Sequence, residues 1–170
     1  MACAYAYHAP PLKLSYRGLG ELAVALCYGP LIAAGKFLAQ RGDWNPQLVL
    51  VSIPLGLLIA AFLWINEFPD YLADQTAGKR TLVVRLGRKK ASRVFGLLVF
   101  LAFATLAVLP KMGLLNGILL GAVSLFPAVQ AARRLSLESE VTAEIIPAQG
   151  RTLLAFLLYA LGTGVGFLME

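Results

Sequence analysis

Charged residues are scarce in this sequence. They make up 14% of its 170 residues, whereas 59% are hydrophobic, and the mean hydropathy is +0.74. A soluble domain usually contains about 25% charged and about 45–50% apolar residues. Both deviations exclude an ordinary water-soluble domain and favour a protein that lies in lipid. The length is that of one compact unit, so we expect a single domain over residues 1–170.

Cysteine and histidine are also rare. Cys3 and Cys27 are too few for a disulfide framework and lack metal-ligand spacing. His8 is the only histidine, and a lone histidine gives no basis for assigning a catalytic residue. Strand-like alternation of apolar and polar residues is absent, as are low-complexity linkers. The pattern therefore predicts an all-α protein.

Long apolar runs are abundant. Five of them approach the ~20 residues that cross a bilayer as a helix, and they are Leu19–Leu38, Leu48–Phe68, Val94–Leu109, Met112–Ala132 and Thr152–Met169. We therefore expect an integral membrane bundle of five transmembrane helices. Pro110-Lys111 joins the third and fourth runs so tightly that they must form an antiparallel hairpin. Glu21 and Lys36 lie near the ends of the first run, where we expect their side chains to snorkel towards water.

The basic residues alternate between the two ends of these runs. If the N-terminus and the loops 69–93 and 133–151 share one side of the membrane, that side holds 12 of the 15 basic residues. The other side keeps Lys36, Arg41 and Lys111. The positive-inside rule then places residues 69–93 in the cytoplasm. The net charge of +6 thus reflects membrane topology, and we expect no nucleic-acid partner.

Glycines recur at four-residue spacing in the last two runs. Gly113, Gly117 and Gly121 form one series, and Gly162 and Gly166 form another. Small residues at this spacing let helix backbones approach closely in lipid. We expect both series to lie at helix–helix contacts.

One stretch carries a candidate chemical site. Asn66, Asp70 and Asp74 are spaced by four residues, so on a continuous helix they would line one face. Two carboxylates at this spacing repel each other unless a cation lies between them. Hard oxygen ligands suit Mg²⁺, which also takes phosphate oxygens and water, and Lys79 and Arg80 follow directly as phosphate contacts. The spacing is equally compatible with solvated loop carboxylates beside a basic cluster.

Two motifs resemble a known family. The run NEFPDYLADQTAGKRTLVVRLG (66–87) closely resembles the second aspartate-rich motif of the UbiA superfamily of intramembrane prenyltransferases. It is most similar to the branch that prenylates dihydroxynaphthoate for menaquinone or phylloquinone. The run YHAPPLKLSYRGLGE (7–21) resembles a second segment of the same branch.

The resemblance implies a Mg²⁺-dependent transfer of a polyprenyl group from a prenyl diphosphate to an aromatic acceptor. It implies that Asp70 and Asp74 bind the metal with support from Asn66. It also implies that the diphosphate contacts three basic side chains, those of Lys13, Lys79 and Arg80. The expected location is the inner or plasma membrane of a prokaryote, or a plastid membrane.

The chain departs from the family pattern in one respect. Members have nine transmembrane helices and a first acidic motif, NxxxDxxxD, in their N-terminal half. Here the only aspartate besides Asp70 and Asp74 is Asp43, which lies in a loop on the opposite side. We therefore expect the C-terminal part of a nine-helix fold, with an N-terminal half missing and autonomous activity in doubt. The alternative is a non-catalytic membrane fragment or interaction module. A transporter is disfavoured because the acidic pair lies at one helix end.

Overall fold

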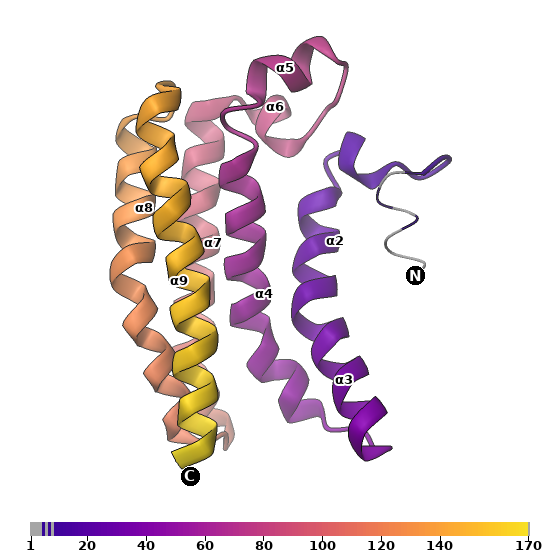
Figure 1. The fold of residues 1–170 in the computed structure, drawn as a ribbon, viewed down its shortest axis with the longest axis vertical. Helices are drawn as coiled ribbons and strands as arrows, with labels where there is room; N and C mark the ends of the chain where they lie inside the picture. The colour runs from indigo at the N-terminus through magenta and orange to yellow at the C-terminus, as the bar shows by residue number, and fades with distance from the viewer. Residues whose placement is uncertain (1–4, 6, 8, 170) are drawn as a thin grey trace.

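The computed structural model describes residues 5, 7 and 9–169. Within them the chain is helical and contains no strand. The long helices run nearly parallel or antiparallel to one another, and the short helices α5 and α6 lie over one end of the bundle (Figure 1). The all-α architecture predicted from the sequence is confirmed.

The helices follow one another with short connections. In chain order they are η1 (Leu14–Tyr16), α2 (Gly20–Leu26), η2 (Cys27–Leu31), α3 (Ile32–Arg41), α4 (Pro46–Asn66), α5 (Tyr71–Thr76), α6 (Leu82–Leu86), α7 (Arg88–Val108), η3 (Leu109–Met112), η4 (Asn116–Ser124), α8 (Leu125–Leu137) and α9 (Thr142–Met169).

Five continuous helical stretches are long and apolar enough to span a membrane. They are Gly20–Arg41, Pro46–Asn66, Arg88–Met112, Asn116–Leu137 and Thr142–Met169. Each contains most of one apolar run, so the five predicted spans are confirmed. The last helix begins at Thr142 rather than Thr152, because a helix satisfies its backbone hydrogen bonds outside lipid as well as inside it.

Local sequence explains where α4 begins. The Asn45 side chain accepts a hydrogen bond from the backbone N–H of Gln47 at 2.9 Å, as a helix N-cap does. Pro46 follows at the first helical position, where its missing N–H costs nothing.

The core lies between α4, α7, α8 and α9. Trp64 and Phe68 from α4 and the turn after it meet Phe95 of α7 there, and the Trp64 indole N–H donates to the Ala91 carbonyl at 3.0 Å. The first span is different: 6% of its apolar window is buried, against 44% for α4. It therefore packs through a single face, with α4 as its main neighbour.

That face is built around two glycines. A Cβ added at Gly29 would lie 2.9 Å from the Ser52 carbonyl oxygen and 3.0 Å from the Cα of Gly56. A Cβ at Gly56 would lie 2.6 Å from the Ala25 oxygen. The two backbones touch here, so neither position accepts a larger residue without displacement of the helices.

The two glycine series behave as predicted, with one exception. Gly117 contacts the Gly166 backbone, and a Cβ at Gly121 would lie 2.7 Å from the Thr163 side chain. Gly162 lies against the backbone of residues 120–121. Gly113, however, has open space around it and a φ of +87°. Gly113 ends η3 in a left-handed conformation that favours glycine, so the prediction of a packing role for it is wrong.

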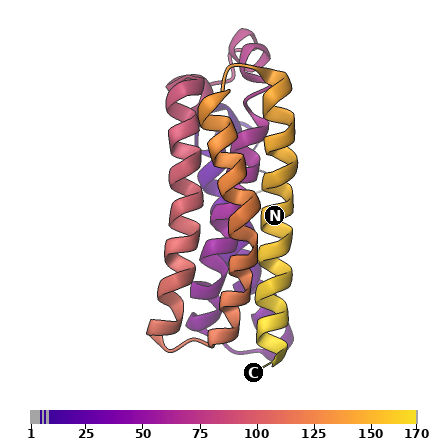
Figure 2. The ribbon, with the colours of Figure 1, turned by 90° about the vertical axis from the view of Figure 1, so that its left-hand side faces the viewer.

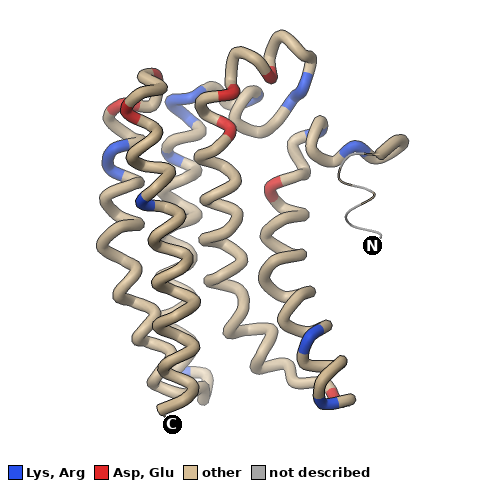
Figure 3. Tube along the Cα trace, in the orientation of Figure 1, with Lys and Arg blue, Asp and Glu red and all other residues tan. Residues whose placement is uncertain are grey.

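The chain between α7 and α8 turns back sharply, and the two helices run antiparallel side by side, as the hairpin prediction required (Figure 2). Charged residues gather at the helix ends, most of them at the end that carries α5 and α6 (Figure 3). The distribution agrees with the charge alternation in the sequence. This end of the bundle is called the charged end below.

Candidate functional site

The candidate site starts where α4 ends. The helix stops at Asn66 and the chain turns before α5 begins at Tyr71. Pro69 explains the break, because proline has no N–H to continue the helical ladder. The Phe68 N–H donates to Ile65 and the Tyr71 N–H to Phe68, both at 3.3 Å. The expectation that Asn66, Asp70 and Asp74 line one face of a continuous helix is therefore wrong.

The two aspartates remain neighbours across one turn. Asp70 is the residue before α5, and its carbonyl accepts the Asp74 N–H at 2.8 Å. The Asp70 carboxylate is exposed and makes no ion pair or hydrogen bond within the described part of the chain. The Asp74 carboxylate is mostly covered, with 13% of its side chain accessible, and pairs with the Lys79 ammonium at 2.9 Å.

Lys79 folds back onto the turn that precedes it. Its N–H donates to the Asp74 carbonyl at 2.9 Å while its ammonium reaches the Asp74 carboxylate. Burial by itself lowers the pKa of Lys79, but the hydrogen bond and charge of Asp74, with the charge of Glu67, outweigh burial and raise it. Lys79 is therefore a fixed positive charge at neutral pH.

Arg80 and Lys13 come together through Tyr16. The Arg80 N–H donates to the Tyr16 carbonyl at 3.2 Å, and its guanidinium belongs to an exposed side chain. The Lys13 ammonium is 5.7 Å from the centre of the Tyr16 ring. The three predicted diphosphate contacts, Lys13, Lys79 and Arg80, thus lie on two chain segments that touch each other at Tyr16.

A hydrogen bond from Leu82 to Glu21 joins these two segments, and the sequence did not predict it. Its side chain is 5% exposed, and its Oε1 accepts the Leu82 N–H at 3.0 Å. Gly18, at φ +70°, leaves room for the Leu82 side chain, which a Cβ would meet at 3.1 Å. The expectation that Glu21 snorkels to water is wrong, because Glu21 is buried and its carboxylate accepts a backbone N–H instead of contacting water. The sequence does contain a signal for this role, because Glu21 is a carboxylate at the start of an apolar run, where a charged group needs a partner.

Glu67 is a further acidic group inside this site, besides Asp70, Asp74 and Glu21. Burial, and next to it the negative charge of Glu21, raise the pKa of Glu67 to about 8, although Thr81 and Lys79 oppose the shift. Its Oε2 is buried and has no hydrogen-bond partner in the described part of the chain. Glu67 therefore holds its proton at neutral pH and does not add a full negative charge to the site.

Asn66 and Arg88 anchor the site to the bundle. The Asn66 Oδ1 accepts a hydrogen bond from the Gln149 Nε2 at 2.9 Å, which ties the end of α4 to α9. The Arg88 guanidinium donates to the Phe68 and Glu140 carbonyls, both at 2.9 Å, and lies 5.2 Å from the centre of the Tyr71 ring. Arg88 belongs to the basic loop 69–93, which the sequence indicates as a topology determinant, and the sequence does not predict its packing role.

The donor set fits a particular kind of metal site. Within the described residues, no group of three His, Cys, Asp or Glu side chains is close enough to hold an ion. Asp74 is engaged by Lys79 and the Asn66 oxygen already accepts one hydrogen bond. An all-protein cage is thus excluded among these residues. Two carboxylates fit Mg²⁺ that takes its other ligands from phosphate and water, as this ion commonly does.

Comparisons with known proteins point to one family. The UbiA prenyltransferase family matches residues 1–146. The chain is 37% identical over 97 residues to "UbiA prenyltransferase domain-containing protein 1" of Dictyostelium discoideum, covering 57% of the chain and 29% of that relative. It is 35% identical over 104 residues to the "2-carboxy-1,4-naphthoquinone phytyltransferase" of Synechocystis sp., covering 61% and 34%.

A third relative is the "1,4-dihydroxy-2-naphthoate octaprenyltransferase" of Bacillus subtilis, 34% identical over 91 residues, with 54% of the chain and 29% of the relative covered. The chain thus spans about a third of the length of these curated relatives. No solved structure gives a significant match.

Proposed function

Because the chain belongs to the UbiA prenyltransferase family, we propose that it takes part in transferring a polyprenyl group from a prenyl diphosphate to an aromatic acceptor. A dihydroxynaphthoate-like acceptor is the proposed substrate class, since relatives that match it are named as naphthoate and naphthoquinone prenyltransferases. The observation that carries the proposal is the meeting of the acidic turn at Asp70 and Asp74 with the basic segments at Lys13, Lys79 and Arg80.

The proposed chemistry begins with the leaving group. Positive side chains stabilise the negative charge that grows on a departing diphosphate, and Lys13, Lys79 and Arg80 supply them. Cleavage of the C–O bond leaves the electron pair on the diphosphate and positive charge on the allylic carbon. An electron-rich ring carbon of the acceptor then bonds to this carbon, and loss of a proton or a carboxyl group restores aromaticity. We assign none of these steps to a catalytic residue of this chain.

Members of the family generally depend on a divalent metal. We propose Mg²⁺, held by Asp70 and Asp74 with Asn66 beside them, where it would act as a Lewis acid on the diphosphate oxygens. The Lys79–Asp74 ion pair is central to this proposal. A ligand that brings its own cation to Asp74 frees the Lys79 ammonium to bind phosphate, so metal and diphosphate should bind together.

The chain is an integral membrane protein, and we propose that its charged end faces the cytoplasm. The charge distribution supports this orientation through the positive-inside rule. A prokaryotic inner membrane or a plastid membrane is the proposed location, in keeping with the bacterial and cyanobacterial relatives.

We also propose that turnover requires a second acidic segment, of the kind that the family pattern has in its N-terminal half. The sequence resemblance implies two acidic motifs, and one of them is present here. The sparse burial of the first span leaves helix surface free for such a half. A non-catalytic membrane fragment or interaction module is the second candidate, because the chain spans only about a third of the length of its relatives.

Purified protein with and without a co-expressed N-terminal half of a relative tests these proposals. With the half present, Mg²⁺, a prenyl diphosphate and dihydroxynaphthoate should give prenylated product, and D70A or D74A should lower the rate at least about 10²-fold, as loss of a key electrostatic group does. Calorimetry should detect Mg²⁺ binding with pyrophosphate but not without it. Absence of product in every combination would leave the non-catalytic candidate standing. Turnover by the chain alone would refute the need for a second acidic segment.

A further inference from the structure

A groove runs along the outer side of α7 and α8, away from the candidate site. Its volume is about 450 Å³, and both helices line it over several turns. The two helices run antiparallel and side by side (Figure 2). Both belong to membrane spans, so in a bilayer this groove is open to lipid.

The part of the groove that lies away from the charged end is apolar. Phe100 and Phe103 of α7 face Leu125 and Val129 of α8 across it, and Phe100 is 66% exposed. Gly96 also lines the groove, and a Cβ placed there would meet nothing within 4 Å. These walls offer van der Waals contact to a hydrocarbon chain and no hydrogen bond.

The end of the groove near the charged end is basic. Arg93 of α7 and Arg133 of α8 both line it, and no carboxylate does. Both side chains are exposed and have no ion pair or hydrogen bond within the described residues. Each arginine lies a few residues from its helix end, Arg88 in α7 and Leu137 in α8. The antiparallel packing therefore brings the two guanidiniums to the same depth.

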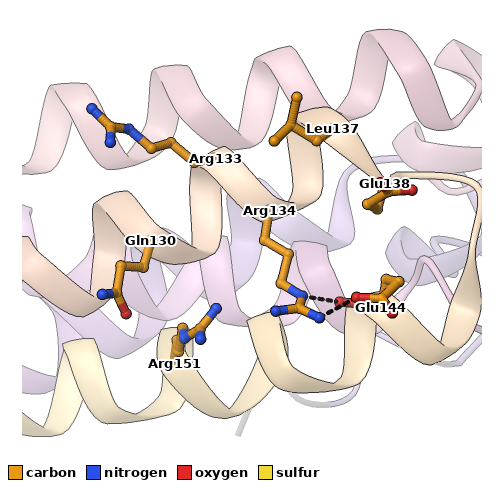
Figure 4. Close-up of a pocket in the computed structure, with 7 residues that line it drawn as sticks. All are labelled: Gln130, Arg133, Arg134, Leu137, Glu138, Glu144 and Arg151. Atoms are coloured by element: carbon orange, nitrogen blue, oxygen red, sulfur yellow. Dashed lines mark hydrogen bonds and ion pairs between the residues drawn. The ribbon is translucent and has the colours of Figure 1, made fainter.

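A neighbouring hollow between α8 and α9 is also lined by Arg133, together with Arg134 and Arg151, but it contains two carboxylates as well. Arg134 there is neutralised by Glu144, to whose carboxylate and carbonyl it donates, and Glu138 adds a second negative charge to the lining. The Arg133 side chain points away from that ion pair (Figure 4). Arg133 is thus available to the groove on its other side.

We propose that the α7–α8 groove binds an anionic phospholipid, with an acyl chain along Gly96 and Phe100 and the phosphate between Arg93 and Arg133. Guanidinium groups are well suited to phosphate because of their planar set of donors. Anionic lipids are concentrated in the cytoplasmic leaflet, where basic groups between membrane helices bind their head groups. The apolar part of the groove selects a lipid over a free phosphate. This site does not depend on the proposed prenyl transfer.

The test uses the whole chain in nanodiscs that contain equal amounts of dioleoylphosphatidylglycerol and dioleoylphosphatidylcholine. After gentle detergent extraction, native mass spectrometry counts the lipids that remain bound. Near-surface attraction of about 1 kcal/mol per basic residue corresponds to about fivefold in binding for each arginine. The phosphatidylglycerol preference should therefore fall about 25-fold in R93A/R133A.

The matched control is K89A/K90A, which removes two exposed charges from the first turn of the same helix but outside the groove. It should keep most of the preference. Gly96→Leu should reduce retention of both lipids by filling the groove, whereas Gly96→Ala should change little. Saturating glycerol 3-phosphate should not displace the lipid.

Any one of four outcomes would overturn the proposal. Equal retention of the two lipids by the unmodified chain would mean that the groove has no anionic preference. An equal loss in K89A/K90A and R93A/R133A would mean diffuse surface attraction rather than a site. Displacement by glycerol 3-phosphate, or no effect of Gly96→Leu, would mean an anion site without an acyl groove. Circular dichroism of each variant verifies that the helices are retained.

Discussion

Replacing Glu67 with glutamine should remove a pH dependence of stability that the unmodified chain possesses. In the folded protein Glu67 holds its proton up to about pH 8, while in the unfolded chain it loses the proton near its ordinary pKa of 4.5. Between these values unfolding releases a proton, so rising pH favours the unfolded state. The stabilising effect of the protonated form is complete below pH 4.5 and is lost as the pH rises through 8.

The structure sets the size of the effect. A rise of the Glu67 pKa from 4.5 to about 8, at about 1.4 kcal/mol per pH unit, gives a ceiling of roughly 5 kcal/mol. Glu67 is only partly covered, and water screening reduces the interaction, so we expect a loss of at least about 2 kcal/mol. Burial is the first cause and the charge of Glu21 the second. E21Q should therefore shrink the loss without abolishing it.

The assay is reversible unfolding in mixed micelles at pH 5.5, 7 and 8.5, without metal or phosphate. The unmodified chain should lose stability across this range and E67Q should not. D70N is the matched control, since it neutralises an exposed carboxyl at the same turn and should leave the pH dependence unchanged. Stability that rises with pH in the unmodified chain, or an identical slope in E67Q, would refute the reasoning.

Three further predictions concern the hydrogen bond between Glu21 and Leu82, the contact between Gly117 and Gly166, and the membrane topology. E21A should destabilise the protein by about 1–3 kcal/mol, because the Leu82 N–H loses its buried acceptor. E21Q keeps an acceptor and should lose less stability. Equal losses of stability in the two variants, measured by chemical unfolding, would contradict the hydrogen bond. Gly166→Leu should lower the free energy of unfolding by at least about 1–3 kcal/mol, because the larger side chain forces apart the contact with Gly117. Gly164→Leu is the control and should be tolerated, because Gly164 has open space around it. Similar melting temperatures of the two variants would exclude the contact. A cysteine at exposed position Gln75 should react with a membrane-impermeant probe from the cytoplasmic side, and labelling from the opposite side would reverse the proposed orientation.

The parts of the fold that depend on local pattern could be predicted from sequence. Apolar length is enough to identify the five spans, because lipid imposes the same requirement on every crossing. Pro69 predicts the break after Asn66 as well, since proline marks a helix end, whereas the four-residue spacing of the acidic side chains favours a continuous helix. A spacing argument holds only while the helix continues.

The parts that depend on distant pairs could not be predicted. Glu21 meets Leu82 across 61 residues, and Asn66 meets Gln149 across 83. No local pattern specifies these partners, because side-chain hydrogen bonds depend on how the helices pack. Gly113 and Gly117 likewise look alike in sequence, yet one ends a helix and the other packs against Gly166.

The glycine contact between the first span and α4 has a mechanical consequence. Gly29 and Gly56 bring the two backbones together at one point. Beyond this contact, the first span is held at its start by the hydrogen bond between Glu21 and Leu82 and has little other burial. Gly20 lies roughly 14 Å along the helix from Gly29, at about 1.5 Å per residue. A tilt of about 5° at this fulcrum therefore displaces the start of α2, with Glu21 beside it, by about 1 Å. A shift of that size in a positioned group is large on the scale of catalysis. A small change of angle at the contact between Gly29 and Gly56 would therefore move Glu21 and its partner Leu82 at the candidate site.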